Sequence, residues 1–275
     1  MAEGRHAVSL IAPLATSGRA EEVMLRVGQA IRLGLLADGE QLPPEAEFAT
    51  QLGVSAMTLR DALAMLRQRG LVETRRGRTG GTFVRRPAAA PLGLLRERLR
   101  ALSVSELRDL TDEQSAVSGA AARLAATRAS TASVRRLLAL ADQLGAAVTP
   151  GAQIRADGRF HIEVAIASKS QRLTALEVAL QTRLAELLWL PVEAGRARRE
   201  AGGRAVEPLT RVPDGSIAHD SGALDDVTAV VEEHAAIAAA IEAADGSRAR
   251  LAAEEHAEAN LRRLTALRLA LPPRP

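Results

Sequence analysis

Apolar residues recur at intervals of three and four along most of this chain, which is the spacing of one face of an α-helix. In the first such segment, Val23, Val27, Ile31 and Leu35 form one stripe. Gly, Pro, Ser and Asp residues separate the segments, as expected at helix boundaries. The pattern therefore predicts helices at residues 21–36, 44–53, 56–69, 93–101, 104–128, 131–146, 152–168, 171–191, 226–244 and 247–270.

A different pattern occurs at residues 71–74 and 81–84, where short β-type runs flank a Gly- and Arg-rich turn. Just before them, Gly53 suits the left-handed residue of a tight turn between helices, and Ser55 is a good N-cap for the helix that follows. Helix, helix, turn, helix and hairpin in this order indicate a winged helix-turn-helix. The expected fold class is mainly α, with this N-terminal unit and a C-terminal all-α helical bundle.

The boundaries between these units follow from breaks in the pattern. A Pro- and Ala-rich stretch predicts a linker, and a Gly-, Arg- and Pro-rich stretch without sustained period predicts a loop inside the bundle, with a lid over a ligand pocket as the alternative. The expected organisation is a flexible N-terminus at 1–18, the winged helix-turn-helix at 19–86, a linker at 87–92, and a helical domain at 93–275 with a loop insertion at 192–225.

The distribution of charge along the chain predicts that the first unit binds nucleic acid. From Arg60 to Arg86 there are eight arginines against two acidic residues, a local net charge of +6, although the whole chain carries only +3. A recognition helix enters the major groove with its N-terminal end, and a basic hairpin contacts the backbone as a wing. The candidate DNA-binding residues are Ser55, Thr58 and Arg60 on the helix and Arg75, Arg76, Gly77 and Arg78 in the wing.

Composition narrows the classes of protein that remain. Cysteine is absent, which excludes disulfides, thiolate zinc sites and cysteine nucleophiles. No run of about 18 uncharged apolar residues occurs and the N-terminus lacks the apolar segment of a signal peptide, so we expect a cytoplasmic protein with no membrane partner.

Four residues of the predicted bundle form a candidate metal site. Asp157 and His161 are four residues apart and project from one helix face. His234 and His256 lie at similar distances on either side of the turn at 245–247, so an antiparallel helix pair would place them side by side. One carboxylate and three imidazoles suit a divalent ion such as Zn, Ni or Mn. The alternative is that these are ordinary surface histidines or hydrogen-bonded core histidines.

An ordered, gap-free run of positions in the winged unit carries a family signature: Gly39, Leu42, Pro43, Glu45, Ala49, Gly53, Val54, Ser55, Thr58, Arg60, Ala62, Leu63, Leu66, Gly70, Leu71, Val72, Gly81, Thr82, Phe83 and Val84. With these residues the unit resembles the DNA-binding domain of GntR-type regulators. The resemblance implies a regulator that binds double-stranded operator DNA as a homodimer, most commonly as a repressor. Ala46 and Ala56 stand where that family often carries Arg or Lys, so we expect Arg60 and the wing arginines to contribute more.

The region 104–270 is similar to the FCD domain of the FadR subgroup of that family. The resemblance implies that Asp157, His161, His234 and His256 bind the divalent metal beside a small carboxylate effector. Gln114, Ser118 and Gln171 stand where the family often has Arg, Glu and Asn, positions of which the Arg and Asn often hold the effector. The candidate effector-binding residues are Gln114, Gln171 and, as a substitute anion contact, Arg183.

Two other hypotheses remain at this point. The bundle could bind an apolar or acyl ligand without a metal. The site could also hold a hydrolytic metal with Glu163, Glu233 or Glu255 as the base. No nucleophile elbow, phosphate-binding loop, dinucleotide fingerprint or HExxH motif is present. We therefore expect a regulator and not an enzyme.

Overall fold

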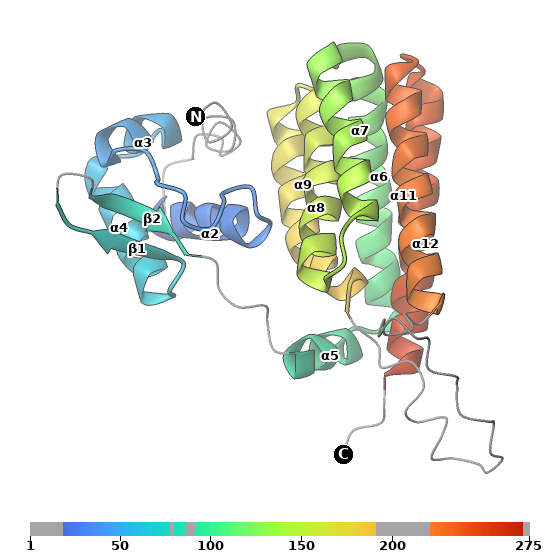
Figure 1. Cartoon of the computed structure of the whole chain (residues 1–275), viewed down its shortest axis with the longest axis horizontal. Helices are drawn as coiled ribbons and strands as arrows, with labels where there is room; N and C mark the ends of the chain where they lie inside the picture. Colours follow the sequence, from blue (N-terminus) through green and yellow to red (C-terminus); the bar gives the residue numbers. More distant parts are fainter. Residues whose placement is uncertain (1–18, 78–79, 86–91, 191–220, 272–275) are drawn as a thin grey trace, which may run out of the picture.

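The computed structural model describes residues 19–77, 80–85, 92–190 and 221–271, without the side chains of 221–226. The predicted N-terminal segment 1–18, Arg78, residues 86–91 of the linker region and residues 192–220 of the insertion lie outside the described residues. Figure 1 shows a small N-terminal unit with a two-stranded hairpin beside a bundle of long, nearly parallel helices. This arrangement agrees with the predicted fold class.

Among the described residues, the N-terminal unit has three helices and one antiparallel hairpin in the predicted order. Gly53 (φ 66°) makes the left-handed turn between the second and third helices. The Ser55 Oγ then accepts a hydrogen bond from the Thr58 N–H at 3.1 Å, which caps the third helix. The first helix ends earlier than predicted, before Gly34 (φ 71°). The elements are α2 (Arg19–Arg32), α3 (Glu45–Leu52), α4 (Ala56–Gln68), β1 (Val72–Arg75) and β2 (Gly81–Val84).

The core of this unit is built from one face of each helix and closed by the hairpin. Val72 pairs with Val84 at the base of the hairpin, and both side chains are buried. A β-bridge from Gln41 to Phe83 ties the segment before α3 to the same hairpin. The largest fully buried side chains here are aliphatic or aromatic: Ile31, Leu36, Phe48, Leu52, Leu59, Leu63 and Leu66.

In the part of the second unit that the structure describes, a short helix is followed by six long ones. Polar N-caps fix where several of them begin; at Ser103 the cap and Glu106 form a reciprocal capping box. The Thr149 Oγ1 accepts a hydrogen bond from the Ala152 N–H at 3.2 Å, so α8 begins at the proline after Thr149 and not at residue 152. The elements are α5 (Leu92–Ala101), α6 (Val104–Arg128), α7 (Thr131–Gly145), α8 (Pro150–Ala167), α9 (Gln171–Leu188), α11 (Ser221–Glu242) and α12 (Gly246–Ala270).

Helix α11 corrects the predicted end of the insertion. It begins at Ser221, whereas the sequence pattern indicated a loop up to residue 225. Ser221 and Gly222 favour turns, but Ala223 and Leu224 after them are strong helix formers. The two helices α11 and α12 join through a tight turn in which Ala244 has φ 55° and the Asp245 side chain caps α12.

The two units touch through the end of α2. Leu33, just beyond α2, is 3% exposed but does not belong to the apolar cluster of its own unit. Its Cδ2 atom lies 3.5 Å from the position that a Cβ at Gly158 of α8 would occupy. Contacts between α2 and α9 complete this junction. Gly158 therefore leaves room on the bundle for a leucine from the N-terminal unit.

Candidate functional site

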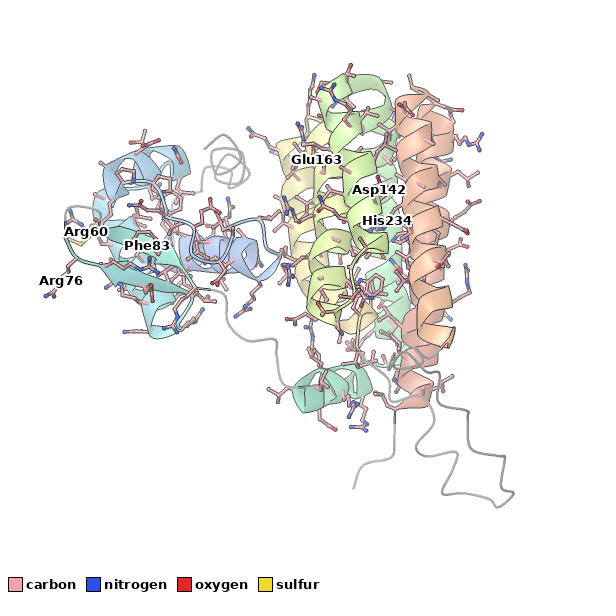
Figure 2. The ribbon with its side chains drawn as sticks, in the orientation of Figure 1. Arg60, Arg76, Phe83, Asp142, Glu163 and His234 are labelled. Carbon is pink, nitrogen blue, oxygen red and sulfur yellow. The ribbon has the colours of Figure 1, made fainter. Side chains whose placement is uncertain are left out.

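The exposed end of the helix-turn-helix carries the residues that the sequence indicated for DNA. Ser55 and Thr58 lie at the N-terminus of α4, and their hydroxyl oxygens are 2.8 Å apart. Arg60 is on the exposed side of the same helix, where its Nε donates to Glu45 Oε2 at 3.0 Å. Figure 2 shows Arg60 pointing outward at the edge of the unit. In the free protein, Glu45 thus offsets part of the charge that Arg60 would bring to a phosphate.

The wing arginines differ from one another in their surroundings. The Arg75 guanidinium stacks 4.3 Å above the Phe83 ring, and its Nε donates to Glu73 at 2.8 Å. Arg76 is exposed at the tip of the hairpin (Figure 2), next to Gly77, which has φ 113°. Arg75 is therefore held against the hairpin, whereas Arg76 extends towards solvent.

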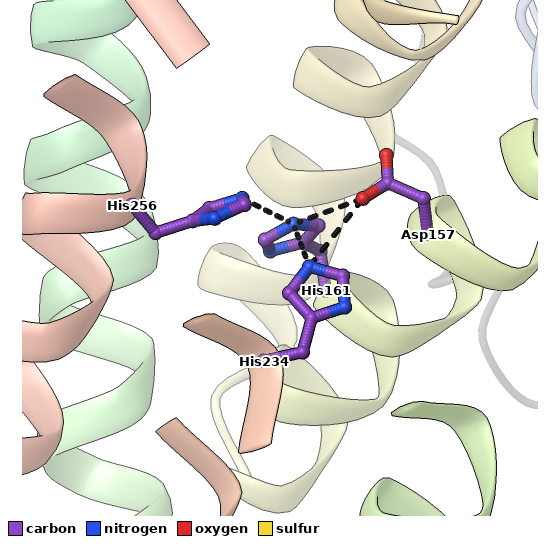
Figure 3. A group of neighbouring side chains, drawn as sticks. All are labelled: Asp157, His161, His234 and His256. Carbon is purple, nitrogen blue, oxygen red and sulfur yellow. Dashed lines mark hydrogen bonds and ion pairs between the residues drawn. The ribbon is translucent and has the colours of Figure 1, made fainter. Parts of the chain in front are cut away.

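Inside the bundle, the four predicted metal ligands come together from three helices. Asp157 and His161 lie on α8, His234 on α11 and His256 on α12 (Figure 3). One ligand atom from each residue lies within 4.8 Å of the others, and no member of the set is more than 4% exposed. His161 Nε2 is 3.3 Å from His234 Nε2 and 3.1 Å from His256 Nε2. Asp157 Oδ1 is 3.4 Å from His234 Nε2. We call these four residues the Asp–His cluster.

Burial sets the protonation states in the Asp–His cluster. Desolvation lowers the pKa of His161 and His234 well below the usual value, so both rings are neutral at neutral pH. Desolvation also raises the pKa of Asp157, whose Oδ2 has no hydrogen-bond partner. Neutral imidazoles that converge on a buried carboxylate have the lone pairs that a divalent cation needs, and the cation would compensate the buried charge. The donor set therefore fits a metal ion.

A second layer of contacts orients His256. Its Nδ1 is 2.7 Å from Glu233 Oε2, and Arg263 Nη2 donates to the other oxygen of Glu233 at 2.6 Å. Burial acts to raise the pKa of Glu233, but hydrogen bonds from His256 and Arg263 lower it overall, so Glu233 is ionised. An ionised Glu233 accepts a hydrogen bond from the Nδ1–H of His256, which leaves the Nε2 atom on the side of the cluster, where Asn260 Nδ2 also lies 3.0 Å from it. This carboxylate–histidine arrangement is typical of metal sites.

A small cavity lies directly beside the Asp–His cluster. Its volume is ≈ 10 Å³, which is room for about one water molecule. Asp157 and two donors from α12, Asn260 and Arg263, contribute the polar part of its lining. Leu188, Trp189 and Val230 contribute the apolar part, and the Trp189 indole N–H is buried without a hydrogen-bond partner.

The three predicted effector-binding residues separate in the structure. Gln114 is fully buried near His256: its Oε1 accepts from Asn260 Nδ2 at 3.3 Å, and its Nε2 has no hydrogen-bond partner. Gln171 is exposed at the start of α9. Arg183 forms an ion pair with Glu113 in a different cavity, between α5, α6 and α9. The structure therefore brings only Gln114 to the Asp–His cluster.

Sequence reasoning missed a buried carboxyl group beside this site. Glu177 on α9 is 1% exposed and accepts hydrogen bonds from Ser118 Oγ at 2.8 Å and Gln181 Nε2 at 2.9 Å. Burial raises its pKa to about 7, although both hydrogen bonds act in the opposite direction. It also missed Asn260 and Arg263, which follow His256 by four and seven residues. That helical spacing is the signal that could have found them.

Comparison with known proteins agrees with both units. The sequence model described as "Bacterial regulatory proteins, gntR family" matches residues 19–84. The FCD domain model matches residues 109–259, which is more than half of the chain. The chain belongs to the GntR family.

Curated relatives of this GntR-family chain are regulators of transcription. RmpR of Mycobacterium gastri, described as an HTH-type transcriptional regulator, is 46% identical over 179 residues, 65% of each chain. An L-lactate dehydrogenase operon regulatory protein of Escherichia coli is 34% identical over 156 residues, 54% of this chain and 58% of its own. The Glc operon transcriptional activator of E. coli is 31% identical over 148 residues, 51% of this chain and 57% of its own.

This GntR-family chain thus spans about two thirds of the length of RmpR and somewhat over half of the other two relatives. Among solved structures, E. coli McbR/YncC is 16% identical with a TM-score of 0.46, covering 91% of this chain and 99% of its own. The relatives are regulators and not enzymes, in agreement with the expectation for this chain. None of the described helices is both long and apolar enough to span a membrane.

Proposed function

We propose that this GntR-family regulator is a cytoplasmic, sequence-specific repressor whose FCD domain holds one divalent metal ion and binds a small carboxylate effector beside it. The main observation in favour of a metal ion is that four buried ligand atoms lie within 4.8 Å of one another. The hydrogen bond from His256 to Glu233 supports it, because it fixes the ring with the Nε2 atom on the side of the other ligands. Zn, Ni and Mn are the candidate ions.

The hydrogen-bond donors around the small cavity support a carboxylate as the proposed effector. Arg263 supplies a cation that Glu233 holds in place, and Asn260 supplies an amide next to His256. The unpartnered Gln114 Nε2 and Trp189 Nε1 are further buried donors near this point. One relative is named for the L-lactate dehydrogenase operon, and lactate is a small carboxylate. The cavity has room for about one water molecule, so it would have to widen to admit such an effector. When bound, the metal would supply a Lewis-acidic position for a carboxylate oxygen.

The DNA-binding side of the proposal rests on α4 and the hairpin. Ser55, Thr58 and Arg60 would contact bases and phosphates in the major groove, and Arg75, Arg76, Gly77 and Arg78 would contact the backbone as a wing. One helix reads only a half-site, so we propose a homodimer on a roughly palindromic operator.

Coupling between the two sites would pass through Leu33. This side chain packs at Gly158, the residue that follows the metal ligand Asp157 on α8. A shift of α8 on metal or effector binding would therefore move the end of α2 and the helix-turn-helix attached to it. Such couplings typically amount to about 1–3 kcal/mol.

The experiment that tests the proposal measures metal and operator binding in the same samples. Protein purified without an affinity tag is analysed by elemental mass spectrometry beside the double variant His234→Ala/His256→Ala. The control is Asp142→Asn, which changes an exposed aspartate on α7. We expect about one ion per chain in the wild type and control, and none in the double variant.

Operator binding is then followed by gel shift on a sequence obtained by in vitro selection, with small carboxylates added to metal-loaded and metal-stripped protein. We expect a carboxylate to weaken operator binding only when metal is present. Wild-type protein that contains no metal, even after reconstitution with Zn, Ni and Mn, would reject the metal and leave DNA binding intact. A carboxylate that strengthens operator binding would reject repression with release.

A further inference from the structure

The first turn of α4 exposes an apolar side chain at the point where the helix would meet DNA. Met57 is 63% exposed, and its neighbour Ala56 is exposed as well. The buried face of the same helix is formed by Leu59, Ala62, Leu63 and Leu66. Met57 is therefore on the outward face, where packing within the unit does not explain a methionine.

The charges around Met57 favour a polyanion as the partner that covers it. Arg60 follows one turn later on α4, and Arg76 extends from the tip of the hairpin; Figure 2 shows both at the same edge of the unit. The first turn itself, residues 55–58, has no charged side chain. An apolar patch between cations fits a partner that has apolar groups between rows of negative charge.

We propose that Met57 reads thymine in the operator through van der Waals contact with the C5 methyl group. Thymine is the only base of unmodified DNA that presents a methyl group in the major groove. Guanine is typically read there by two hydrogen bonds from Arg or Lys, and the first turn of α4 has neither. Arg60, the nearest cation on α4, is paired with Glu45. This inference rests on the proposed operator binding and assigns a base preference to it.

The test removes the methyl group from the DNA without changing base pairing. A preferred operator is first obtained by in vitro selection with the full chain. Each thymine of one half-site is then replaced singly by deoxyuridine, and affinity is measured by fluorescence anisotropy at fixed salt. Loss of one buried methyl contact should weaken wild-type binding about fourfold at one position. Replacement in both half-sites should weaken it about 15-fold.

The same titrations with Met57→Ala distinguish a contact from a packing effect. We expect this variant to bind the thymine operator and its deoxyuridine counterpart equally, because the partner of the methyl group is missing. Leu25→Ala is the matched control: it shortens another exposed apolar side chain of the same unit, on α2. The control should keep the full fourfold difference between thymine and deoxyuridine.

Three outcomes would overturn the inference. Wild-type affinity that changes less than twofold for every deoxyuridine replacement excludes a methyl contact. A Met57→Ala variant that remains fully sensitive to deoxyuridine assigns the contact to another residue. Met57→Ala that loses affinity equally for both operators assigns Met57 to another role. If in vitro selection yields no preferred sequence, the proposed operator binding itself fails. An operator that binds tightly but is insensitive to the methyl group rejects only the thymine contact, so the two failures are distinguishable.

Discussion

The two units of this GntR-family chain differ in which side chains they bury. In the helix-turn-helix, the buried cluster from Val23 to Val84 is entirely apolar. Among the described residues, every buried polar or charged side chain lies in the helical domain instead, between Thr111 and Asn260. Burial of a polar group costs free energy unless hydrogen bonds replace its water. The first core therefore loses no free energy to buried polar side chains, whereas the second contains many, and most of the unpaired buried atoms lie at one place.

That place is the surroundings of the Asp–His cluster. Buried polar atoms without a hydrogen-bond partner include Asp157 Oδ2, His234 Nδ1 and Gln114 Nε2. Gln181 Oε1 and Trp189 Nε1 are also unpaired, on the nearby helix α9 and at its end. Concentrated unsatisfied groups of this kind are expected where a ligand or ion supplies the missing partners. The comparison thus separates an apolar core from a polar one that the proposed ion or effector would complete.

The largest change in stability should come from a substitution in the apolar core of the helix-turn-helix. Phe48→Ala removes a fully buried ring from the helix-turn-helix and should lower its free energy of unfolding by about 3–5 kcal/mol. Operator binding should be lost with it, whereas the bundle should still bind about one metal ion per chain. Denaturant unfolding followed by circular dichroism, together with metal analysis, checks both parts. Loss of metal from Phe48→Ala would show that the two cores are not independent. The control Leu25→Ala, at an exposed site, should change stability by less than about 0.5 kcal/mol.

A smaller change in stability, in this case a gain, should come from a substitution in the polar core of the helical domain. Burial raises the pKa of Glu177 from 4.5 to about 7, which corresponds to about 3 kcal/mol at about 1.36 kcal/mol per pKa unit. The folded chain keeps this proton while the unfolded chain loses it, so the stability that Glu177 contributes falls as pH rises from about 4.5 to 7. Glu177→Gln does not titrate and should become more stable than the wild type over this range.

The measurement is urea unfolding of both metal-free proteins, in chelator, between about pH 5 and pH 8. The advantage of Glu177→Gln should grow with pH and become constant above about pH 7. Glu258→Gln is the control, because Glu258 is exposed on α12. Stability curves of Glu177→Gln and wild type that run parallel over the whole range would contradict the raised pKa.

The smallest effect, a change in how strongly metal alters operator affinity, should come from a substitution at the junction between the two units. Leu33→Ala removes the side chain that packs at Gly158. Metal content and operator affinity of the metal-free protein should change little. The difference in operator affinity between metal-loaded and metal-stripped protein should fall from about fivefold or more to less than twofold. Unchanged metal dependence in Leu33→Ala would show that coupling follows another route.

Local signals in the sequence determined most of the helices and the composition of the Asp–His cluster. Helices α6 and α7 begin at the predicted residues 104 and 131, where Ser103 and Ser130 cap them, because N-cap chemistry acts within three residues of the helix start. The i, i+4 spacing of Asp157 and His161 also acts locally, and the turn at Asp245 brought His234 and His256 level with each other.

Only the tertiary structure decided which side of each helix faces that site. Gln181 and Arg183 are two residues apart on α9 and so project about 200° apart around its axis. The sequence shows that they cannot share a face, but the packing of α9 on α6 and α8 places Gln181 inside and Arg183 beside Glu113. The same packing exposed Gln171, buried Glu177, and brought Leu33 of one unit against Gly158 of the other. Helix rotation is set by contacts between residues far apart in the chain, and no local pattern of residues encodes it.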